Sequence, residues 1–183
     1  MPRSGAEART RLREAALELY RERGYDATTT AQIAQRAGVT ERTYFRHFAD
    51  KREVLFDGET GLRDVMTGAI ADAPDGASSL ELAVAGYVAA VPLFVAGREV
   101  ATRRAEVIAT APALQERAHA KSAALADAVV AAIVGRGVPE ATARLAARVG
   151  AAAFERASRE WYPHPERDLG ALIQSAADEV RAL

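Results

Sequence analysis

Residues 28–51 read TTTAQIAQRAGVTERTYFRHFADK, and they predict two short helices joined by a tight turn. Thr29 and Gln32 have the capping-box spacing, in which each side chain bonds the other residue's backbone amide at a helix start. Gly38 follows an apolar stripe at helical spacing, where a helix end favours a left-handed residue. Thr40 can then cap the second helix.

Two short helices joined by a glycine-containing turn form a helix-turn-helix, whose second helix can lie in the DNA major groove. Arg42 and Thr43 stand at the start of that helix, where base edges are met, and Arg42 is the candidate for bidentate contact with guanine. Arg46 follows Arg42 by four residues and shares its face. Thr43 suits a phosphate contact, whereas capping explains Thr40 without DNA. The predicted DNA-binding residues are Thr29, Thr30, Arg42, Thr43, Phe45, Arg46, His47 and Lys51.

The other members of this set have different predicted roles. Backbone amides near Thr29 and Thr30 offer a helix N-terminus to a phosphate. His47 either contacts phosphate or packs against the hinge to the next helix. Phe45 has no hydrogen-bonding group, which leaves a contact with a base methyl group or a sugar. Lys51 is expected to reach a phosphate.

Charge is distributed unevenly along the 183 residues, although the net charge is only −1. Residues 1–52 hold 11 Lys and Arg against 7 Asp and Glu, a balance of +4, and residues 53–183 hold 13 against 18, a balance of −5. The basic excess coincides with the helix-turn-helix, as binding to phosphate requires.

The remaining bulk properties favour a cytoplasmic protein. There is no cysteine, which excludes disulfides and thiolate metal sites. The first residues lack an apolar signal region, and no uninterrupted apolar run approaches the ~18–20 residues that span a bilayer. We therefore expect no membrane partner.

Apolar residues recur at helical spacing throughout, without strand-like alternation, which predicts an all-α fold of about nine helices. Pro92 interrupts one apolar stretch and should kink it. Besides the two short helices, the predicted helices span residues 7–23, 50–72, 79–96, 98–109, 110–134, 139–160 and 167–182.

The segment GYDATTTAQIAQRAGVTERTYFRHFADKREVL closely resembles the N-terminal DNA-binding domain of the TetR family of transcriptional regulators. The shared features are the GYxATT start, the IAxxAGV helix at 33–39, the pair His47-Phe48 and the lysine three residues later. The resemblance covers about residues 7–55. It implies nine helices, a homodimer, and repression of transcription that a small ligand relieves. One departure is Phe45, where the family commonly has tyrosine; the adjacent Tyr44 is expected in the core with Phe48.

With this resemblance, we expect a helix-turn-helix domain over residues 1–53 and a ligand-sensing and dimerisation domain over residues 54–183. The second part has no catalytic constellation, and its histidines lack metal-ligand spacing, so no enzymatic activity, cofactor or metal is expected. Ligand pockets are mostly apolar with few polar groups, although aromatic residues at helical spacing can equally be core. The candidate ligand-binding residues are Met66, Ile70, Tyr87, Phe94, Arg103, Phe154 and Trp161.

The last two predicted helices carry small and apolar residues that could pack internally or against a second copy. The resemblance supports a four-helix dimer interface. The candidate interface residues are Val149, Ala152, Leu169, Leu172, Ile173, Ala176 and Val180. A single helix over 50–72 would join the DNA reader to the sensor, with its glycines permitting a tilt.

These features predict a DNA-binding regulator, a repressor that a small hydrophobic or amphipathic ligand releases from double-stranded operator DNA. Two alternatives remain open. One is a dimeric DNA-binding regulator that takes no ligand, and the other is a helical interaction protein without DNA binding. The basic balance and the intact caps argue against the second.

Overall fold

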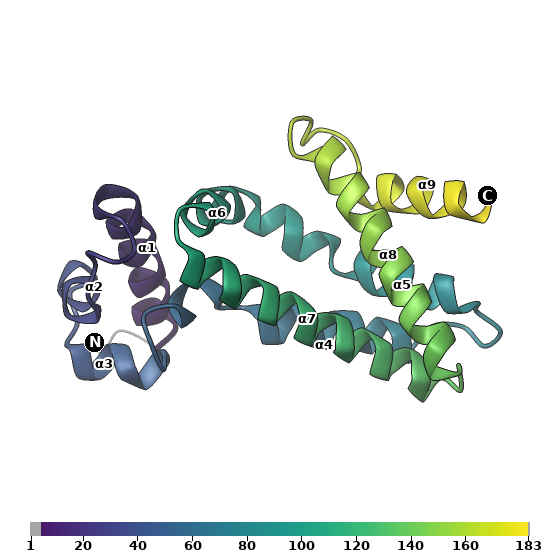
Figure 1. The fold of residues 1–183 in the computed structure, drawn as a ribbon, viewed down its shortest axis with the longest axis horizontal. Helices are drawn as coiled ribbons and strands as arrows, with labels where there is room; N and C mark the ends of the chain where they lie inside the picture. Colours follow the sequence, from purple (N-terminus) through teal and green to yellow (C-terminus); the bar gives the residue numbers. More distant parts are fainter. Residues whose placement is uncertain (1–4, 183) are drawn as a thin grey trace. The chain divides into compact units, whose positions relative to one another are not determined.

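The computed structural model describes residues 5–182, and within them the fold is all-α, as predicted, with nine α-helices, one 3-10 turn and no strand (Figure 1). The elements are α1 (Gly5–Arg23), α2 (Thr30–Arg36), α3 (Glu41–His47), η1 (Glu53–Phe56), α4 (Glu59–Ala71), α5 (Ser79–Ala89), α6 (Val91–Ala109), α7 (Pro112–Gly135), α8 (Glu140–Trp161) and α9 (Leu169–Arg181).

The chain folds into two compact units, each made of two separate stretches of sequence. Unit 1 contains the residues up to 59 together with 97–121, and unit 2 contains 60–96 together with the residues from 122 onward. Helices α6 and α7 therefore each contribute residues to both units, which the helical pattern alone does not indicate. The functional division into residues 1–53 and 54–183 stays a prediction.

Unit 1 is built on a core that α1 to α3 share with η1 and with parts of α6 and α7. Leu12, Ile33, Tyr44 and Leu114 are fully buried there, one each from α1, α2, α3 and α7. The two short helices of the helix-turn-helix thus pack on a larger core. A helix of seven residues is marginally stable by itself, so this packing holds both helices in place.

The predicted single helix over residues 50–72 is wrong. Asp50 does cap a turn, since its carboxylate accepts hydrogen bonds from the amides of Arg52 and Glu53 at 2.7 and 3.1 Å. The turn it caps, however, is the 3-10 turn η1, and Gly58 then adopts a left-handed φ of +96° before α4 begins. Glycine adopts this conformation without the strain a Cβ atom would cause, so the break is built into the sequence.

Pro92 ends a helix rather than kinking one. Helix α5 stops at Ala89, and α6 starts at Val91 with an axis bent by 54° from that of α5. Proline fits the first turn of a helix, where its missing N–H has no partner to lose. The predicted helices over 79–96 and 98–109 are therefore divided differently, as α5 and a longer α6.

The core of unit 2 joins α4, α5, α8 and α9 with parts of α6 and α7. Gly150 marks the closest approach of α8 to α5, because a Cβ atom built there would lie 2.9 Å from the Cβ atom of Ala83. Arg136 follows α7 and closes the end of α4, with its guanidinium donating to the carbonyl oxygens of Ile70, Ala71 and Ala73 at 2.6–3.0 Å. Cations stabilise the exposed carbonyls at a helix C-terminus.

Helix α7 reaches membrane-spanning length in its overall composition, although Lys121 and Asp127 interrupt it, so the expectation that no uninterrupted apolar run has that length stands. By length and composition α7 could cross a bilayer, with a mean hydropathy of 1.3 over 18 residues. Alanine supplies much of that apolar character. The helix also gives buried side chains to both cores, Leu114 to unit 1 and Val129 and Ile133 to unit 2, as a core helix of a folded domain does.

Candidate DNA-binding surface and aromatic core

The predicted caps of α2 and α3 are confirmed. The Thr29 hydroxyl accepts a hydrogen bond from the amide of Gln32 at 3.2 Å, and the Gln32 side chain accepts one from the amide of Thr29 at 2.9 Å. The Thr40 hydroxyl accepts from the amide of Thr43 at 3.2 Å, and Gly38 has a φ of +67°. These polar residues thus have structural roles, which shortens the set of side chains free to contact a ligand.

Tyr44 is in the core, as expected. It is fully buried, its ring centroid lies 5.6 Å from that of Phe48, and its hydroxyl donates to the carbonyl oxygen of Asp50 at 3.0 Å. Burial raises the pKa of Tyr44 well above its ordinary value. Tyr44 therefore orients α3 by its buried side and leaves the opposite side of the helix to solvent.

The outward side of α3 carries two unengaged cations and one aromatic ring. Arg42 and Arg46 are exposed, and no residue that the structure describes accepts a hydrogen bond from either guanidinium. Phe45 lies next to Arg42 on the helix surface and is 52% exposed. By contrast, Glu41 accepts a hydrogen bond from the Thr30 hydroxyl at 2.5 Å, which links α3 to α2.

The N-terminus of α2 offers fewer amides than the sequence suggests. The amide of Thr29 is bonded to Gln32, whereas among the described backbone bonds the amides of Thr30 and Ala31 have no acceptor. The predicted phosphate contact near Thr29 and Thr30 therefore narrows to these two amides and stays a prediction.

His47 is half-buried at the end of α3, and its Nε2 atom is buried without a hydrogen-bond partner among the described residues. Burial lowers the pKa of His47 below its ordinary value, and the charges of Arg46 and Arg9 lower it further, against the opposing effect of Asp57. The imidazole is therefore neutral at pH 7. Its two predicted roles, packing and phosphate contact, are both still open.

Lys51 has a structural role that the sequence does not reveal. Its ammonium group donates to the carbonyl oxygens of Tyr25 and Thr28 at 2.8 and 3.1 Å and lies 4.0 Å from the centre of the Tyr25 ring. An ammonium group has three N–H donors, so one remains for the predicted phosphate contact. Lys51 thus stabilises the loop before α2, and this role does not depend on the predicted phosphate contact.

Ion pairs connect α1 and η1 to the parts of α6 and α7 within unit 1. Glu53 accepts from Arg117 at 2.5 Å and pairs with Lys121 at 3.3 Å, and Arg103 pairs with Glu14 at 3.0 Å. Burial opposes the ionisation of Glu53, but the hydrogen bond from Arg117 and the charge of Lys121 hold its pKa below the ordinary value. Sequence reasoning missed these pairs, since their members lie more than 60 residues apart.

Six of the seven predicted ligand-binding residues share the apolar core of unit 2; they are Met66, Ile70, Tyr87, Phe94, Phe154 and Trp161. The seventh prediction, Arg103, is not part of that cluster, because it lies in unit 1 and is paired with Glu14. Phe154 stacks on Tyr87 with centroids 5.0 Å apart and planes inclined by 17°, and it contacts Phe94 at 4.6 Å.

The Tyr87 hydroxyl is the notable polar group of this cluster. Tyr87 is 92% covered, its hydroxyl makes no hydrogen bond with the described residues, and burial raises its pKa. The hydroxyl oxygen is not among the buried polar atoms that lack a partner, so solvent reaches it. Two surface hollows lie elsewhere, one at the start of α1 and one on α9.

Three predicted dimer residues have no free surface. Leu169, Ile173 and Ala176 are at most 5% exposed and belong to the core of unit 2, so their assignment to an interface is wrong. The apolar stripe of α9 faces inward onto its own chain. The other four candidates keep some surface; they are Val149, Ala152, Leu172 and Val180.

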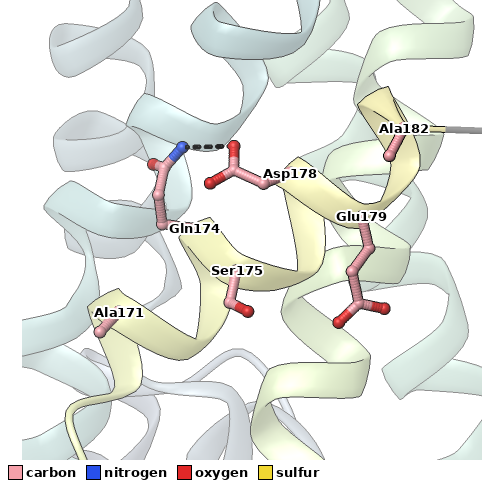
Figure 2. Close-up of a pocket in the computed structure, with 6 residues that line it drawn as sticks. All are labelled: Ala171, Gln174, Ser175, Asp178, Glu179 and Ala182. Carbon is pink, nitrogen blue, oxygen red and sulfur yellow. Dashed lines mark hydrogen bonds between the residues drawn. The ribbon is translucent and has the colours of Figure 1, made fainter.

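The outward side of α9 is a shallow hollow bordered by three short side chains and three longer polar ones (Figure 2). Its lining residues are Ala171, Gln174, Ser175, Asp178, Glu179 and Ala182. The Gln174 amide donates to the Asp178 carboxylate at 3.4 Å across it. A surface of this kind lets another helix approach closely.

Comparison with known proteins identifies the N-terminal part. Residues 12–57 match the model of the family described as "Bacterial regulatory proteins, tetR family". The chain is 29% identical over 186 residues to the HTH-type transcriptional regulator TcmR of Streptomyces glaucescens, covering 94% of this chain and 82% of TcmR.

Residues 12–57 form a TetR-family domain. The chain is a DNA-binding transcriptional regulator.

Solved structures of TetR-family regulators share the fold. SmeT, the repressor of a multidrug efflux pump of Stenotrophomonas maltophilia, in complex with triclosan, superposes with a TM-score of 0.61 at 21% identity, over 96% of this chain and 90% of SmeT. FadR of Thermus thermophilus, in complex with lauroyl-CoA, gives 0.54 at 24% identity, over 92% of this chain and 90% of FadR.

Proposed function

We propose that this regulator is a cytoplasmic homodimeric repressor, without enzymatic activity, that a small apolar or amphipathic ligand releases from its operator. Reading of DNA is assigned to Arg42 and Arg46, whose guanidinium groups are exposed and unengaged beside Phe45. Guanidinium groups on a recognition helix can donate two hydrogen bonds to guanine or neutralise phosphate.

The ligand site is assigned to the rings of Tyr87, Phe94 and Phe154 in unit 2. The stacking of these three rings is the single observation that carries this assignment, because a mostly apolar ligand with one polar group would fit against the rings and the Tyr87 hydroxyl. Phe94 closes the cluster from the first turn of α6, where its amide donates to the carbonyl oxygen of Ala90 at 3.1 Å. A ligand would enter by replacing Phe94 on the Phe154 ring.

The route from ligand to DNA is assigned to α6. This helix begins in unit 2 with Phe94 and ends in unit 1, where Arg103 pairs with Glu14 of α1 and Arg104 donates to the carbonyl oxygen of Leu55 at 3.3 Å. A ligand that favours one position of Phe94 therefore acts on a helix that also contacts the DNA-binding helices. This replaces the continuous helix over 50–72, which the fold does not contain.

The dimer is assigned to α8 and the outward side of α9. Short side chains at Ala171, Ser175 and Ala182 allow the same helix of a second copy to pack there about a two-fold axis. Ser175→Arg would block that approach and yield a monomer in analytical ultracentrifugation, while Arg63→Glu, at an exposed position of α4, would leave the dimer intact. A monomeric wild-type protein contradicts this assignment.

The ligand response is tested with triclosan and lauroyl-CoA, the compounds bound to SmeT and FadR, at the head of a small panel of aromatic and acyl compounds. A ligand should raise the melting temperature and weaken operator binding at least tenfold, and Phe154→Leu should reduce both effects. Arg103→Gln should keep the thermal shift but lose part of the operator effect. If no compound changes the melting temperature or the operator affinity, the alternative of a dimeric DNA-binding regulator that takes no ligand is favoured.

A further inference from the structure

Phe45 is a large apolar side chain placed in the middle of the cationic recognition surface. In helical projection, Phe45 lies between Glu41 and Arg42, with Arg46 beyond, and the two arginines lie on the side opposite to buried Tyr44. Glu41 is engaged by Thr30, whereas the two arginines are not engaged. The free part of this surface is therefore one aromatic ring with two cations beside it, which is complementary to the polyanionic DNA groove.

The ring of Phe45 is held in a defined direction. It packs edge-on against Tyr44, with centroids 5.6 Å apart and planes inclined by 82°. Tyr44 is itself fixed by burial and by its hydrogen bond to the carbonyl oxygen of Asp50. One edge of the Phe45 ring is thus anchored on the core, and the other is presented outward. A contact made by a pre-oriented aromatic ring loses little side-chain entropy on binding.

The chemistry of Phe45 restricts what it can contact favourably. A phenyl ring that covered a base nitrogen or oxygen atom would strip it of water without offering a hydrogen bond, which costs free energy. The C5-methyl group of thymine is the apolar group that the major groove presents among the four standard bases. Cytosine methylated at C5 carries the same group in the same place.

We propose that Phe45 reads a C5-methyl group, so that each operator half-site contains a thymine whose methyl group contacts this ring. The inference rests on the proposed reading of DNA by α3. Arg42 precedes Phe45 by three residues, a rise of about 4.5 Å, which is comparable to the 3.4 Å between successive bases. The thymine therefore lies within about two base pairs of the guanine that Arg42 contacts.

The test is a methyl-deletion scan of an operator selected by binding from a random duplex library. Each thymine is replaced in turn by deoxyuridine, which keeps every hydrogen-bonding atom and removes only the methyl group. For the wild-type protein, one position per half-site should weaken binding about fourfold, the effect of one lost apolar carbon. Cytosine at that position, paired with guanine, should bind more tightly when it is 5-methylated.

Variants decide whether Phe45 is responsible. With Phe45→Ala, deoxyuridine at the sensitive position should cost nothing further, whereas with Arg42→Ala the fourfold effect should persist. Phe45→Leu keeps an apolar contact and should retain part of the effect, and circular dichroism melting checks that each variant is folded. If no thymine is sensitive, or if the sensitivity is the same in Phe45→Ala, the inference is overturned while operator binding stands. Absence of any selected operator would overturn the proposed function as well.

Discussion

Removing the Lys51 ammonium group should destabilise the protein, even though Lys51 was predicted from sequence as a phosphate contact. Lys51→Met keeps a similar side-chain volume but leaves the carbonyl oxygens of Tyr25 and Thr28 without their donor and removes the charge 4.0 Å from the Tyr25 ring. Each lost hydrogen bond is worth about 1 kcal/mol and the cation–π contact about 0.5 kcal/mol at a half-exposed site. The free energy of unfolding should therefore fall by about 2.5 kcal/mol.

Urea unfolding followed by far-UV circular dichroism measures this loss, and Trp161, the only tryptophan, separately reports unit 2 by its fluorescence. Arg46→Met is the matched control, because Arg46 is exposed and unengaged: its stability should stay within about 0.5 kcal/mol of wild type. Both Lys51→Met and Arg46→Met should flatten the dependence of operator affinity on salt concentration by the amount that corresponds to about one phosphate contact. Equal stability of Lys51→Met and wild type would refute the structural role of Lys51.

Further predictions concern packing, helix capping and pH. Gly150→Ala should destabilise unit 2 by about 1–3 kcal/mol, because its Cβ atom would overlap α5, whereas Gly68→Ala, with open space around it, should stabilise α4 by up to about 1 kcal/mol in thermal unfolding. Arg136→Gln should cost about 1–3 kcal/mol in urea unfolding, since the carbonyls at the end of α4 lose a charged donor. If His47 contacts phosphate, the nearby negative charge raises its lowered pKa in the complex, so binding takes up a proton. Operator affinity should then increase as the pH falls from 7.5 to 5.5. If affinity does not depend on pH over this range, and His47→Gln does not change that, His47 has a packing role alone.

The helix-turn-helix could be predicted closely because its signals are local. Capping residues, the glycine turn and the apolar spacing all act within a few residues, and they agree with one another. The break at Gly58 was missed for a related reason: a glycine inside an apolar helical pattern is compatible with either a weakened helix or a left-handed turn. The choice depends on surrounding tertiary contacts, such as the ion pair of Asp57 with Arg13 at 3.7 Å.

Long-range relations could not be predicted. The apolar stripe of α9 shows that Ile173 is buried but not which chain buries it, and the fold settles that it faces its own core. Arg103 was predicted to contact a ligand because the sequence around it does not indicate its ion-pair partner, Glu14, which lies 89 residues away. Lys51 likewise meets Tyr25 and Thr28 only after the chain has folded back on itself.

The account depends most on the outward side of α3 as the surface that binds DNA. Fluorescence anisotropy on the selected operator, with wild type, Arg42→Ala and Arg159→Ala, tests this directly. Arg42→Ala should cost about 1–3 kcal/mol, a loss of about 5- to 150-fold, and should relax the preference at one base pair, whereas Arg159→Ala on α8 should bind as wild type does. Unchanged affinity and base preference for Arg42→Ala would contradict the account.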